Sequence, residues 1–550
     1  MTSKDKGKES IQQDATTKDH PDEEDQTDDD GHDDPSQVAG TSASGAASAS
    51  KKKKKKKSKL SKLMKRDKSN IPEAFVHQVI ERVKAEGSIP EEDLTVENIR
   101  GVLEHLKIMD VVQGKAGLLG SNAKDMGEHK FWETQPVPQP GEGPPLDDGY
   151  IEPSKPREEI RQEPYPLPKE FEWSVLDIGD PQQCKEVYDL LSANYVEDDQ
   201  ASFRFKYSAE FLKWALMPPG YHKEWHIGVR VVSSKKLVAF ISGVPMTLHV
   251  RKNIITVTEI NYLCVHKRLR SKRLAPVLIK EVTRQTHLKG IFQAIYTAGV
   301  IIPTPVSTCR YFHRSINVPK LLEVGFCFVP RNMTQARMIR LNAVPDTPTI
   351  PGVREMEVKD VLQTASLFTR YMRRFGLAPI FDVEEIKHYF LSGKGEGNIG
   401  DGGPGRRKGQ VTWSFVVEDP ETHQITDFFS FYSLPSTVIG NQKHPILEAA
   451  YLFYYATTVA FEPNAEEDGR LKARVKALIT DAFAIAGAAK FDVFNALTLM
   501  DNANILQDLK FGPGDGFLNF YLYNWRTAPL AGMGPEGDVP AGKGVGIVML

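Results

Sequence analysis

Two kinds of hydrophobic patterning follow one another along this chain, and the change falls near Trp173. Residues 1–70 hold few apolar side chains, and Gln135–Pro168 is rich in proline. The first stretch predicts disorder and the second an extended segment. From Trp173 to Leu550 the pattern of folded elements is almost unbroken. β-Branched and aromatic runs predict strands at 226–233, 237–243, 246–250, 254–265, 292–298, 325–329, 411–418, 425–433, 492–496 and 517–524. Helical spacing predicts helices at 181–193, 208–215, 275–289, 308–314, 318–323, 358–374, 383–391, 445–460, 470–487 and 501–508.

These elements predict a mixed α/β (α+β) protein, because the strands and helices lack the regular alternation of a doubly wound sheet. The halves at about 170–335 and 340–550 have comparable element content but no repeat at the level of residues. We expect three parts: a disordered arm at 1–110, a first lobe at 111–335 and a second lobe at 336–550.

The net charge of -2 conceals two blocks of opposite charge. Residues 19–34 carry ten Asp or Glu, and residues 51–70 carry twelve Lys or Arg against one Asp. The lysine run Lys51–Lys57 is typical of a solubilising or nuclear-localisation-like tail, and also of a segment that docks on ribosomal RNA or another anionic surface. It lacks interleaved aromatic residues for base stacking, and we expect no DNA partner.

The four cysteines form no CxxC pair, and no histidine cluster has metal-ligand spacing. Reduced thiols, no metal site and a cytoplasmic protein are therefore expected. No apolar run reaches the ~18 residues that a membrane span needs.

The most informative segment is Glu259–Gly290, where a strand, a basic turn and a helix follow one another. Ile254–Val265 predicts a mostly buried strand, five cations fall within Lys267–Arg273, and helical spacing begins at Ala275. Free N–H groups and the helix dipole both face such a turn, so the arrangement suits a phosphate group. A polyphosphate held there leaves its other end beside the strand.

A Gly-rich stretch at 393–409 contains a formal GxGxxG at Gly400, Gly402 and Gly405. We do not interpret it as a nucleotide site, because Pro404 interrupts it and a strand rather than a helix is predicted to follow. A surface insertion is expected instead.

Arg270–Ala275 resembles the phosphate-binding R/Q-x-x-G-x-G/A loop of the GNAT acyltransferases, with Arg273 where a glycine is usual. Longer blocks resemble signature sequences of the N-myristoyltransferase family, and they span about residues 125–550. These blocks are His129–Pro136, Asn194–Asp199, Phe203–Phe205, Glu259–Glu281, Tyr296–Arg314 and Lys510–Trp525. The long arm and the Gly-rich insertion look fungal. The resemblance implies two GNAT-like lobes with a pseudo-twofold relation, the first binding myristoyl-CoA and the second completing a peptide groove.

The resemblance also implies the reaction. Enzymes of this family move a myristoyl group from CoA to the N-terminal glycine amine of proteins or nascent chains, by direct addition–elimination without an acyl-enzyme. Myristoyl-CoA would be a co-substrate, and no tightly bound cofactor is expected. Backbone N–H groups of Tyr262 and Leu263 would form the oxyanion hole. Asn261 and Thr297 would orient the glycine.

The general base implied by the family is the C-terminal carboxylate, here that of Leu550. The tail Val545–Leu550 is apolar and should be buried, unlike most chain termini. Desolvation would raise the pKa of this carboxylate and lower that of the incoming amine, which eases proton transfer between them. The alternative is that the tail only packs.

Two binding surfaces are implied as well. CoA and its acyl chain would contact His129, Lys130, Phe131, Trp132, Leu263, Cys264, Val265, Arg270, Ser271, Lys272, Arg273, Leu274 and Ala275. The peptide would contact Tyr195, Asp198, Asp199, Phe203, Phe205, Tyr296, His313, Tyr432, Leu434 and Asp515. Each aromatic taken singly could instead be core packing, and the acidic residues a solvated loop. Cys264 is not interpreted as a nucleophile, because no acidic residue is evident to orient its neighbour His266.

Two other functions fit parts of the sequence. One is a GNAT enzyme that uses a shorter acyl-CoA. The other is a non-catalytic RNA- or ribosome-binding protein built around Lys51–Lys57. The interpretation that accounts for most residues is a cytoplasmic N-myristoyltransferase-like enzyme, with ribosome association as a further expectation.

Overall fold

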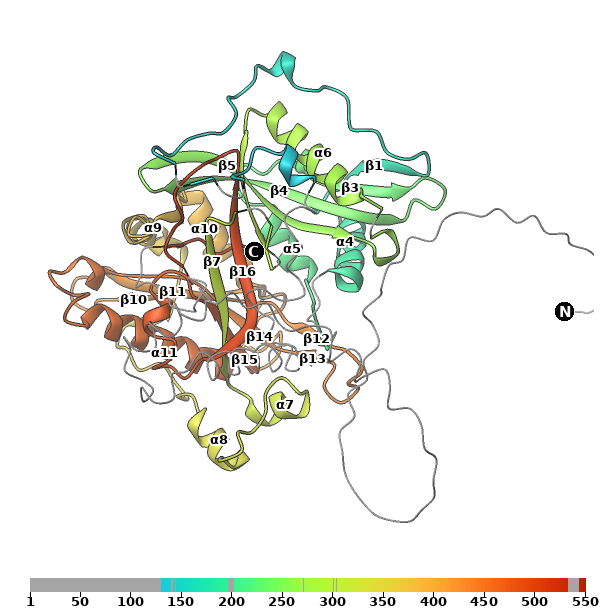
Figure 1. Ribbon diagram of the computed structural model, residues 1–550. Helices are drawn as coiled ribbons and strands as arrows, with labels where there is room; N and C mark the ends of the chain where they lie inside the picture. Colours follow the sequence, from blue (N-terminus) through green and yellow to red (C-terminus); the bar gives the residue numbers. More distant parts are fainter. Residues whose placement is uncertain are drawn as a thin grey trace, which may run out of the picture. The chain divides into compact units, whose positions relative to one another are not determined.

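The same series of strands and helices occurs twice along the chain of this computed structural model (Figure 1). The structure describes residues 130–139, 142–143, 145–195, 202–270, 272–299, 301–302, 304–532 and 544–550, all within the unit Gly101–Leu550. The first series is β1 (Phe171–Val175), α4 (Pro181–Asn194), α5 (Ala209–Leu216), β3 (His226–Val231), β4 (Leu237–Val250), β5 (Asn253–Val265), α6 (Leu274–Leu288), β6 (Gln293–Ala298) and β7 (Ser307–Ser315). The second is β8 (Val353–Glu355), α9 (Val361–Met372), α10 (Val383–Leu391), β10 (Thr412–Glu418), β11 (Ile425–Ser433), β14 (Ala449–Thr457), α11 (Arg470–Ala488), β15 (Val493–Leu497) and β16 (Gly512–Tyr523).

The two series join in one mixed sheet of 13 strands, and its order confirms the pseudo-twofold relation. The order is β1-β3-β4-β5-β6-β16-β7-β15-β14-β11-β10-β8. Counted from either end, it passes through equivalent strands of the two series. Parallel pairs β5–β6 and β14–β15 occupy equivalent places. The last strand of each series lies beside the other series, so β16 pairs with β6 and β7 pairs with β15. Each half of the sheet therefore contains one strand from the other series. The predicted division of the chain into two lobes near residue 335 stays a prediction.

Helices cover both faces of the sheet. Ala239 and Ile241 of β4 pack with α6 through Leu278, while Phe240, which points to the other face, joins the cluster that holds α4 and α5. This alternation follows from the period of two in a strand. Among the described residues, no helix is long and apolar enough to cross a membrane.

Several short elements complete the described chain. They are β2 (Phe203–Phe205), β9 (Leu377–Pro379), β12 (Ser436–Val438), β13 (Ile446–Leu447), α7 (Val318–Glu323) and α8 (Gln335–Leu341). β9 pairs with the end of β4, and β2 pairs with β12. Each pairing ties one half of the chain to the other.

Most predicted elements are confirmed, but four are wrong. The segments at 308–314 and 445–460, predicted as helices, contain the strands β7 and β14. The predicted strand at 325–329 does not form, and 501–508 holds only a short 3-10 helix, Asn502–Asn504. β14 is buried on both faces, so its sequence lacks the alternation that identifies a strand. The predicted strands at 237–243 and 246–250 are one continuous strand, β4.

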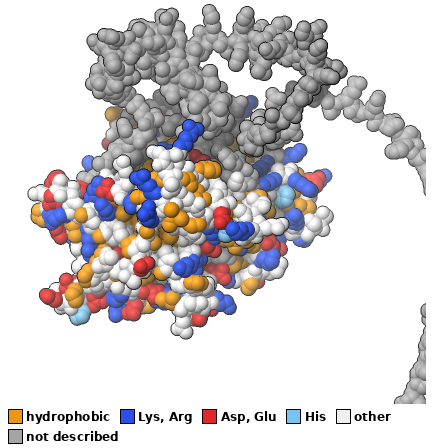
Figure 2. All heavy atoms as spheres, turned by 90° about the horizontal axis from the view of Figure 1, so that it is seen from below, with side chains coloured by type: hydrophobic (Ala, Val, Ile, Leu, Met, Phe, Trp, Pro, Cys, Tyr) orange, Lys and Arg blue, Asp and Glu red, His pale blue; other side chains and the backbone are white. Residues whose placement is uncertain are grey.

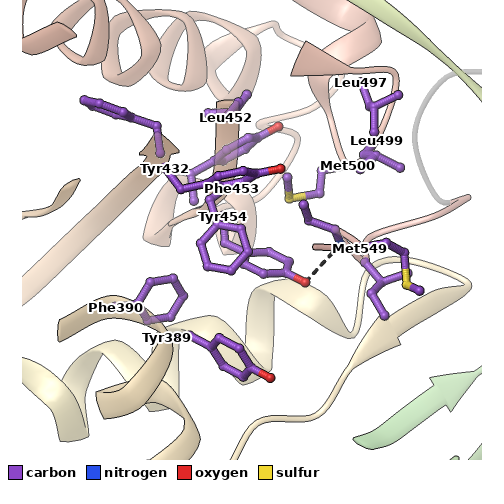
Figure 3. Close-up of a cluster of buried hydrophobic side chains, with 14 of the residues drawn as sticks. Tyr389, Phe390, Tyr432, Leu452, Phe453, Tyr454, Leu497, Leu499, Met500 and Met549 are labelled. Carbon is purple, nitrogen blue, oxygen red and sulfur yellow. Dashed lines mark hydrogen bonds between the residues drawn. The ribbon is translucent and has the colours of Figure 1, made fainter. Parts of the chain in front are cut away.

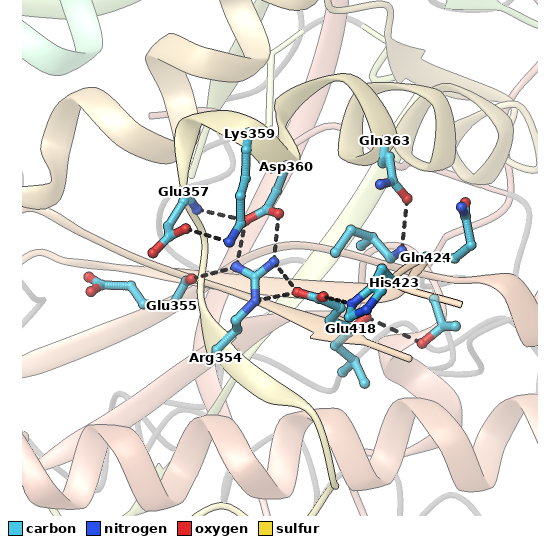
Figure 4. A network of polar contacts seen from close by, with 12 residues as sticks. Arg354, Glu355, Glu357, Lys359, Asp360, Gln363, Glu418, His423 and Gln424 are labelled. Carbon is cyan, nitrogen blue, oxygen red and sulfur yellow. Dashed lines mark hydrogen bonds and ion pairs between the residues drawn. The ribbon is translucent and has the colours of Figure 1, made fainter. Parts of the chain in front are cut away.

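An arginine-centred network fastens the edge strand β8 to β10 (Figure 4). Arg354 donates two 2.7 Å hydrogen bonds to the carboxylate of Asp360 and a third, also 2.7 Å, to Glu418. Burial alone would raise the pKa of Asp360, but the hydrogen bonds from Arg354 and from the backbone of Glu357, together with the nearby positive charges, outweigh it and lower that pKa. The pair therefore stabilises the fold above the ordinary aspartate range and loses this effect in acid.

Replacing Arg354 with alanine is expected to lower the free energy of unfolding by about 2 kcal/mol, because the buried Asp360 carboxylate would lose its main partner. Urea denaturation at pH 7 measures the change. Lys359→Ala is the matched control, since its ion pair with Glu357 is exposed to solvent and should contribute little to stability. Equal losses in the two variants would contradict the assignment.

Candidate active site

A bulge in β5 creates the centre of the candidate site. Asn261 pairs with Ser242 and Cys264 with Phe240, so Tyr262 and Leu263 together oppose the single residue Ile241. Tyr262 has a left-handed backbone with φ 56. Such a conformation is unusual for a residue with a side chain and turns the following peptide groups out of the ladder.

Beyond the bulge β5 leaves its neighbour β6. Their parallel pairing ends at Ile260 and Tyr296. A cavity of about 170 Å³ lies in the gap, and its lining is mainly aliphatic and aromatic. The wall includes Asn261, Tyr262 and Leu263 of β5, Thr297 of β6, and Ile279, Val282 and Thr283 of α6. The structure thus brings together four residues that the sequence assigned to catalysis.

Aromatic rings close one side of this cavity. Trp132 stacks on Tyr296 at 5.4 Å between ring centroids, and Tyr296 stacks on Tyr521 at 5.1 Å. Tyr195 also lines the cavity, and the backbone of Tyr262 donates a hydrogen bond to its phenol oxygen. Burial raises the pKa of Tyr195, and the bond from Tyr262 offsets only part of the rise. The phenol is therefore neutral and available as a hydrogen-bond donor.

The C-terminal tail is buried, as its apolar sequence predicts. Gly544 and Gly546 exchange backbone hydrogen bonds with Leu377, the first residue of β9. Val548 N donates to the hydroxyl of Tyr454 at 3.0 Å (Figure 3). In Figure 1 the chain end lies among the central strands rather than at the periphery. These contacts hold the partly buried last residue against the core.

Glu259 joins the tail to the bulge, and the sequence did not single it out as a site residue. Its Oε1 accepts a 2.7 Å hydrogen bond from Asn261 Nδ2 and a 3.5 Å bond from Leu550 N. The two donor atoms are consequently no more than about 6 Å apart. Burial raises the pKa of Glu259 to about 7, against a smaller lowering by the bonds from Asn261 and Leu550. The only feature of the sequence that could have identified Glu259 is an acidic residue at an inward-facing position of a predicted strand.

Cys264 is unsuited to act as a nucleophile. Its side chain is 2% exposed, and burial raises the pKa of the thiol to about 12, with only partial relief from Arg270. The neighbouring His266 instead uses its Nδ1 to accept a hydrogen bond from Arg268 N. The thiol therefore stays protonated near neutral pH.

The basic turn after β5 ends in a residue with the backbone conformation that favours glycine. Arg273 precedes α6 with φ 55 and ψ 28, a left-handed geometry that explains why a glycine is usual there. Arg270 donates through Nη2 to the carbonyl of Asn194, and Asn194 Oδ1 accepts from Lys267 N. Asn194, which is buried at the end of α4, is a second residue whose role the sequence did not show. It fixes the turn in front of the α6 N-terminus.

The predicted peptide residues fall into two groups. Phe203 and His313 both pack on Phe326, with centroids 5.7 and 5.3 Å away. Asp515 is exposed on β16 and acts electrostatically on His313. Tyr432 and Leu434 are buried with 5% and 6% exposure, so the structure places them in the hydrophobic core. The rings of Phe205 and Tyr195 both pack on the buried ring of Tyr207, which belongs to that core.

Four predicted contact residues lie outside the described residues: His129, Asp198, Asp199 and Ser271. Lys130, Lys272 and Arg273 are exposed, and Leu274 is buried against β4, so Leu274 can meet a ligand only through its backbone. The assignments of individual residues to CoA and peptide stay predictions.

Two domain families match the chain over most of its length. Residues 150–309 match the N-terminal domain of myristoyl-CoA:protein N-myristoyltransferase, and residues 323–548 match its C-terminal domain. The chain belongs to the N-myristoyltransferase family. It is therefore a transferase that depends on myristoyl-CoA, and the predicted family is confirmed.

The relatives agree with this assignment. A glycylpeptide N-tetradecanoyltransferase of Aspergillus fumigatus is 52% identical over 81% of this chain and 89% of its own. The Mycosarcoma maydis enzyme is 47% identical over 84% and 75%. A Saccharomyces cerevisiae N-myristoyltransferase crystallised with bound myristoyl-CoA superimposes with a TM-score of 0.73 and 47% identity, covering 78% of this chain and 100% of that one. The non-catalytic alternative is thereby excluded.

Proposed function

We propose that this protein transfers a myristoyl group from myristoyl-CoA to the N-terminal glycine amine of proteins, by direct attack without an acyl-enzyme. The observation that carries the mechanism is the meeting of Asn261 and Leu550 N at one oxygen of Glu259, beside the bulge at Tyr262. This arrangement supports a mechanism in which polar groups bind the amine beside backbone donors for the thioester.

Binding of the CoA end follows from the turn before α6. Backbone N–H groups at the start of α6, with the exposed Lys272 and Arg273, would bind the CoA phosphates. The thioester would then reach Tyr262 and Leu263, whose N–H groups would stabilise the oxyanion. The apolar cavity between β5 and β6 would take the acyl chain. A longer chain covers more of this lining, which favours myristoyl over acetyl.

The amine end follows from Glu259. Because Asn261 Nδ2 donates to Glu259, the amide oxygen of Asn261 is left to accept from the glycine ammonium. The Leu550 carboxylate would take one ammonium proton, and the neutral amine would attack the thioester carbonyl. The C–N bond forms, the C–S bond breaks, and CoA leaves as a thiolate that accepts the second proton. Thr297 would orient the amine from β6.

The test is transfer of a labelled myristoyl chain to a peptide that starts with glycine, compared with the same peptide starting with alanine. Transfer to the first alone is expected. A second measurement incubates enzyme with labelled myristoyl-CoA and no peptide, then quenches in acid. Label that remains covalently on the protein would overturn the direct mechanism.

Substituting Tyr262 with phenylalanine is expected to raise the free energy of unfolding by about 1 kcal/mol, because the buried hydroxyl has no partner among the described residues. Acylation of a glycine peptide should be unchanged, since only the backbone of Tyr262 is proposed to act. Tyr454→Phe is the contrasting control: its hydroxyl binds Val548 N, and its loss should destabilise. A large loss of kcat in Tyr262→Phe would show that its hydroxyl contacts substrate.

We also propose that the arm associates with ribosomes in the cytoplasm through Lys51–Lys57, which lies outside the described residues. The charge of the run supports this. Co-sedimentation with ribosomes should be lost when the seven lysines are replaced by glutamine, while peptide acylation in solution persists.

A further inference from the structure

The segment from α7 to α8 exposes several large apolar side chains. The helix α8 has no buried residue. Phe328 is 81% exposed, and Ile339 and Leu341 are each 40% exposed. Single exposed apolar residues are ordinary on protein surfaces. The helix α8 differs because it carries two of them and buries no residue, so burial of an apolar face does not stabilise it.

The part of this segment that follows α7 is basic. Between Val324 and Pro345 it carries Arg331, Arg337 and Arg340 and no acidic residue. All three arginines are exposed, and none forms an ion pair with any residue in the described part of the chain. We call the exposed side chains of Phe328, Arg331, Arg337, Ile339, Arg340 and Leu341 the α8 surface.

The α8 surface lies at one end of the molecule. In Figure 1, α7 and α8 project below the sheet. The view from that side, Figure 2, shows hydrophobic side chains gathered at the centre of the face with Lys and Arg among and around them. Phe326, two residues before Phe328 in the chain, packs on Phe203 and His313, which are predicted peptide residues.

We propose that the α8 surface docks on an anionic lipid membrane. Apolar side chains that enter the headgroup boundary, flanked by cations that bind lipid phosphates, are the signature of interfacial attachment. RNA would match the three arginines but would gain little from Ile339 and Leu341, since aliphatic side chains do not stack on bases as aromatic ones do. With three cations the attachment is weak and reversible. It would bring the exit of the groove close to a lipid surface.

The test uses the full chain carrying Phe328→Trp, mixed with phosphatidylcholine vesicles that contain about 30% phosphatidylserine and a brominated lipid. Bromine quenches a tryptophan that enters the acyl region. Leu362→Trp is the matched control, because Leu362 is 68% exposed on α9, away from α8. Both variants keep the same lysine run, so any attraction of the arm to the vesicle is equal in the two. After subtraction of the parent signal, the fluorescence of the tryptophan introduced at position 328 should fall at least twofold, and that of the tryptophan introduced at position 362 should not.

Replacing Arg331, Arg337 and Arg340 with alanine in the Phe328→Trp chain should reduce the quenching at least threefold. Neutral vesicles should give little quenching. No quenching at position 328 while the protein sediments with the vesicles would overturn the proposal. A second result would also overturn it: the emission spectrum of the Phe328→Trp chain does not change with vesicles but changes with added RNA, or with protein concentration alone.

The surface lies outside the proposed catalytic machinery, so Phe328→Ser should acylate a soluble glycine peptide at the parent rate. A loss of vesicle docking with that rate intact separates this inference from the proposed function. Circular dichroism should confirm that Phe328→Ser is folded.

Discussion

Deletion of Leu550 is expected to lower kcat for acylation of a glycine peptide by about a thousandfold, within the range that general bases contribute. The tail is held by backbone bonds at Gly546 and Val548, so a chain ending at Met549 keeps its carboxylate one residue short of Glu259. The distance to the amine then grows by up to ~3.5 Å, beyond direct proton transfer. Myristoyl-CoA binding, measured by titration calorimetry, should change less than threefold.

Leu550→Ala is the matched control for that deletion. It retains both the terminal carboxylate and the backbone N–H that donates to Glu259, and it removes only a partly buried side chain. Its kcat should stay within about tenfold of the parent value. If the deletion and the alanine variant lose the same amount, the tail acts by packing and the carboxylate is not the base.

Replacing Glu259 with leucine is expected to lower kcat about a hundredfold, because the amide of Asn261 and the N–H of Leu550 would lose their common acceptor. An unpaired buried donor costs ~1–3 kcal/mol, and two are created here. Glu259→Gln keeps an acceptor oxygen of nearly the same shape and should stay within about tenfold. Because Glu259 is proposed to position other groups, the loss should fall on kcat more than on the KM for myristoyl-CoA.

The glutamine variant also tests the charge of this residue. Burial holds the pKa of Glu259 at about 7, against 4.5 ordinarily. Between these values the unfolded chain is ionised while the folded chain keeps its proton, so stability from this group is present below about pH 4.5 and lost as pH rises through 7. The full loss is about 3 kcal/mol.

Urea denaturation from pH 5 to 8 measures this effect. As the pH rises, the free energy of unfolding of the parent should fall by an amount that Glu259→Gln does not lose. The difference in unfolding free energy, variant minus parent, should rise with pH. Glu357→Gln, at an exposed position, is the control and should give a flat difference. A flat difference for Glu259→Gln as well would contradict a buried, protonated carboxyl.

The errors in the predicted elements have a common cause. In β7 the polar residues Arg310, His313 and Arg314 interrupt any simple alternation, and each finds its partner far along the chain. His313 donates to Asn495, and Arg314 donates to Asn342. Their spacing therefore looked helical, because the groups that satisfy them in a strand belong to distant segments.

Local chemistry was enough to predict the strand β5, the basic turn and the helix α6, because each depends on neighbours within a few residues. It was also enough to predict a buried tail, since six mostly apolar residues cannot remain in water without cost. The family followed from these blocks. The sequence did not reveal Asn194 or Glu259, because a single polar residue acquires its meaning only from the atoms around it.

What the sequence alone determined was thus the family, the basic turn between β5 and α6, and the burial of the apolar tail. Only the tertiary structure decided that β7 and β16 exchange places between the two halves of the sheet and that Leu550 meets Glu259, 291 residues earlier in the chain. The physical reason is that such contacts are fixed by the packing of whole strands and buried surfaces. No local preference of the residues that finally touch encodes them.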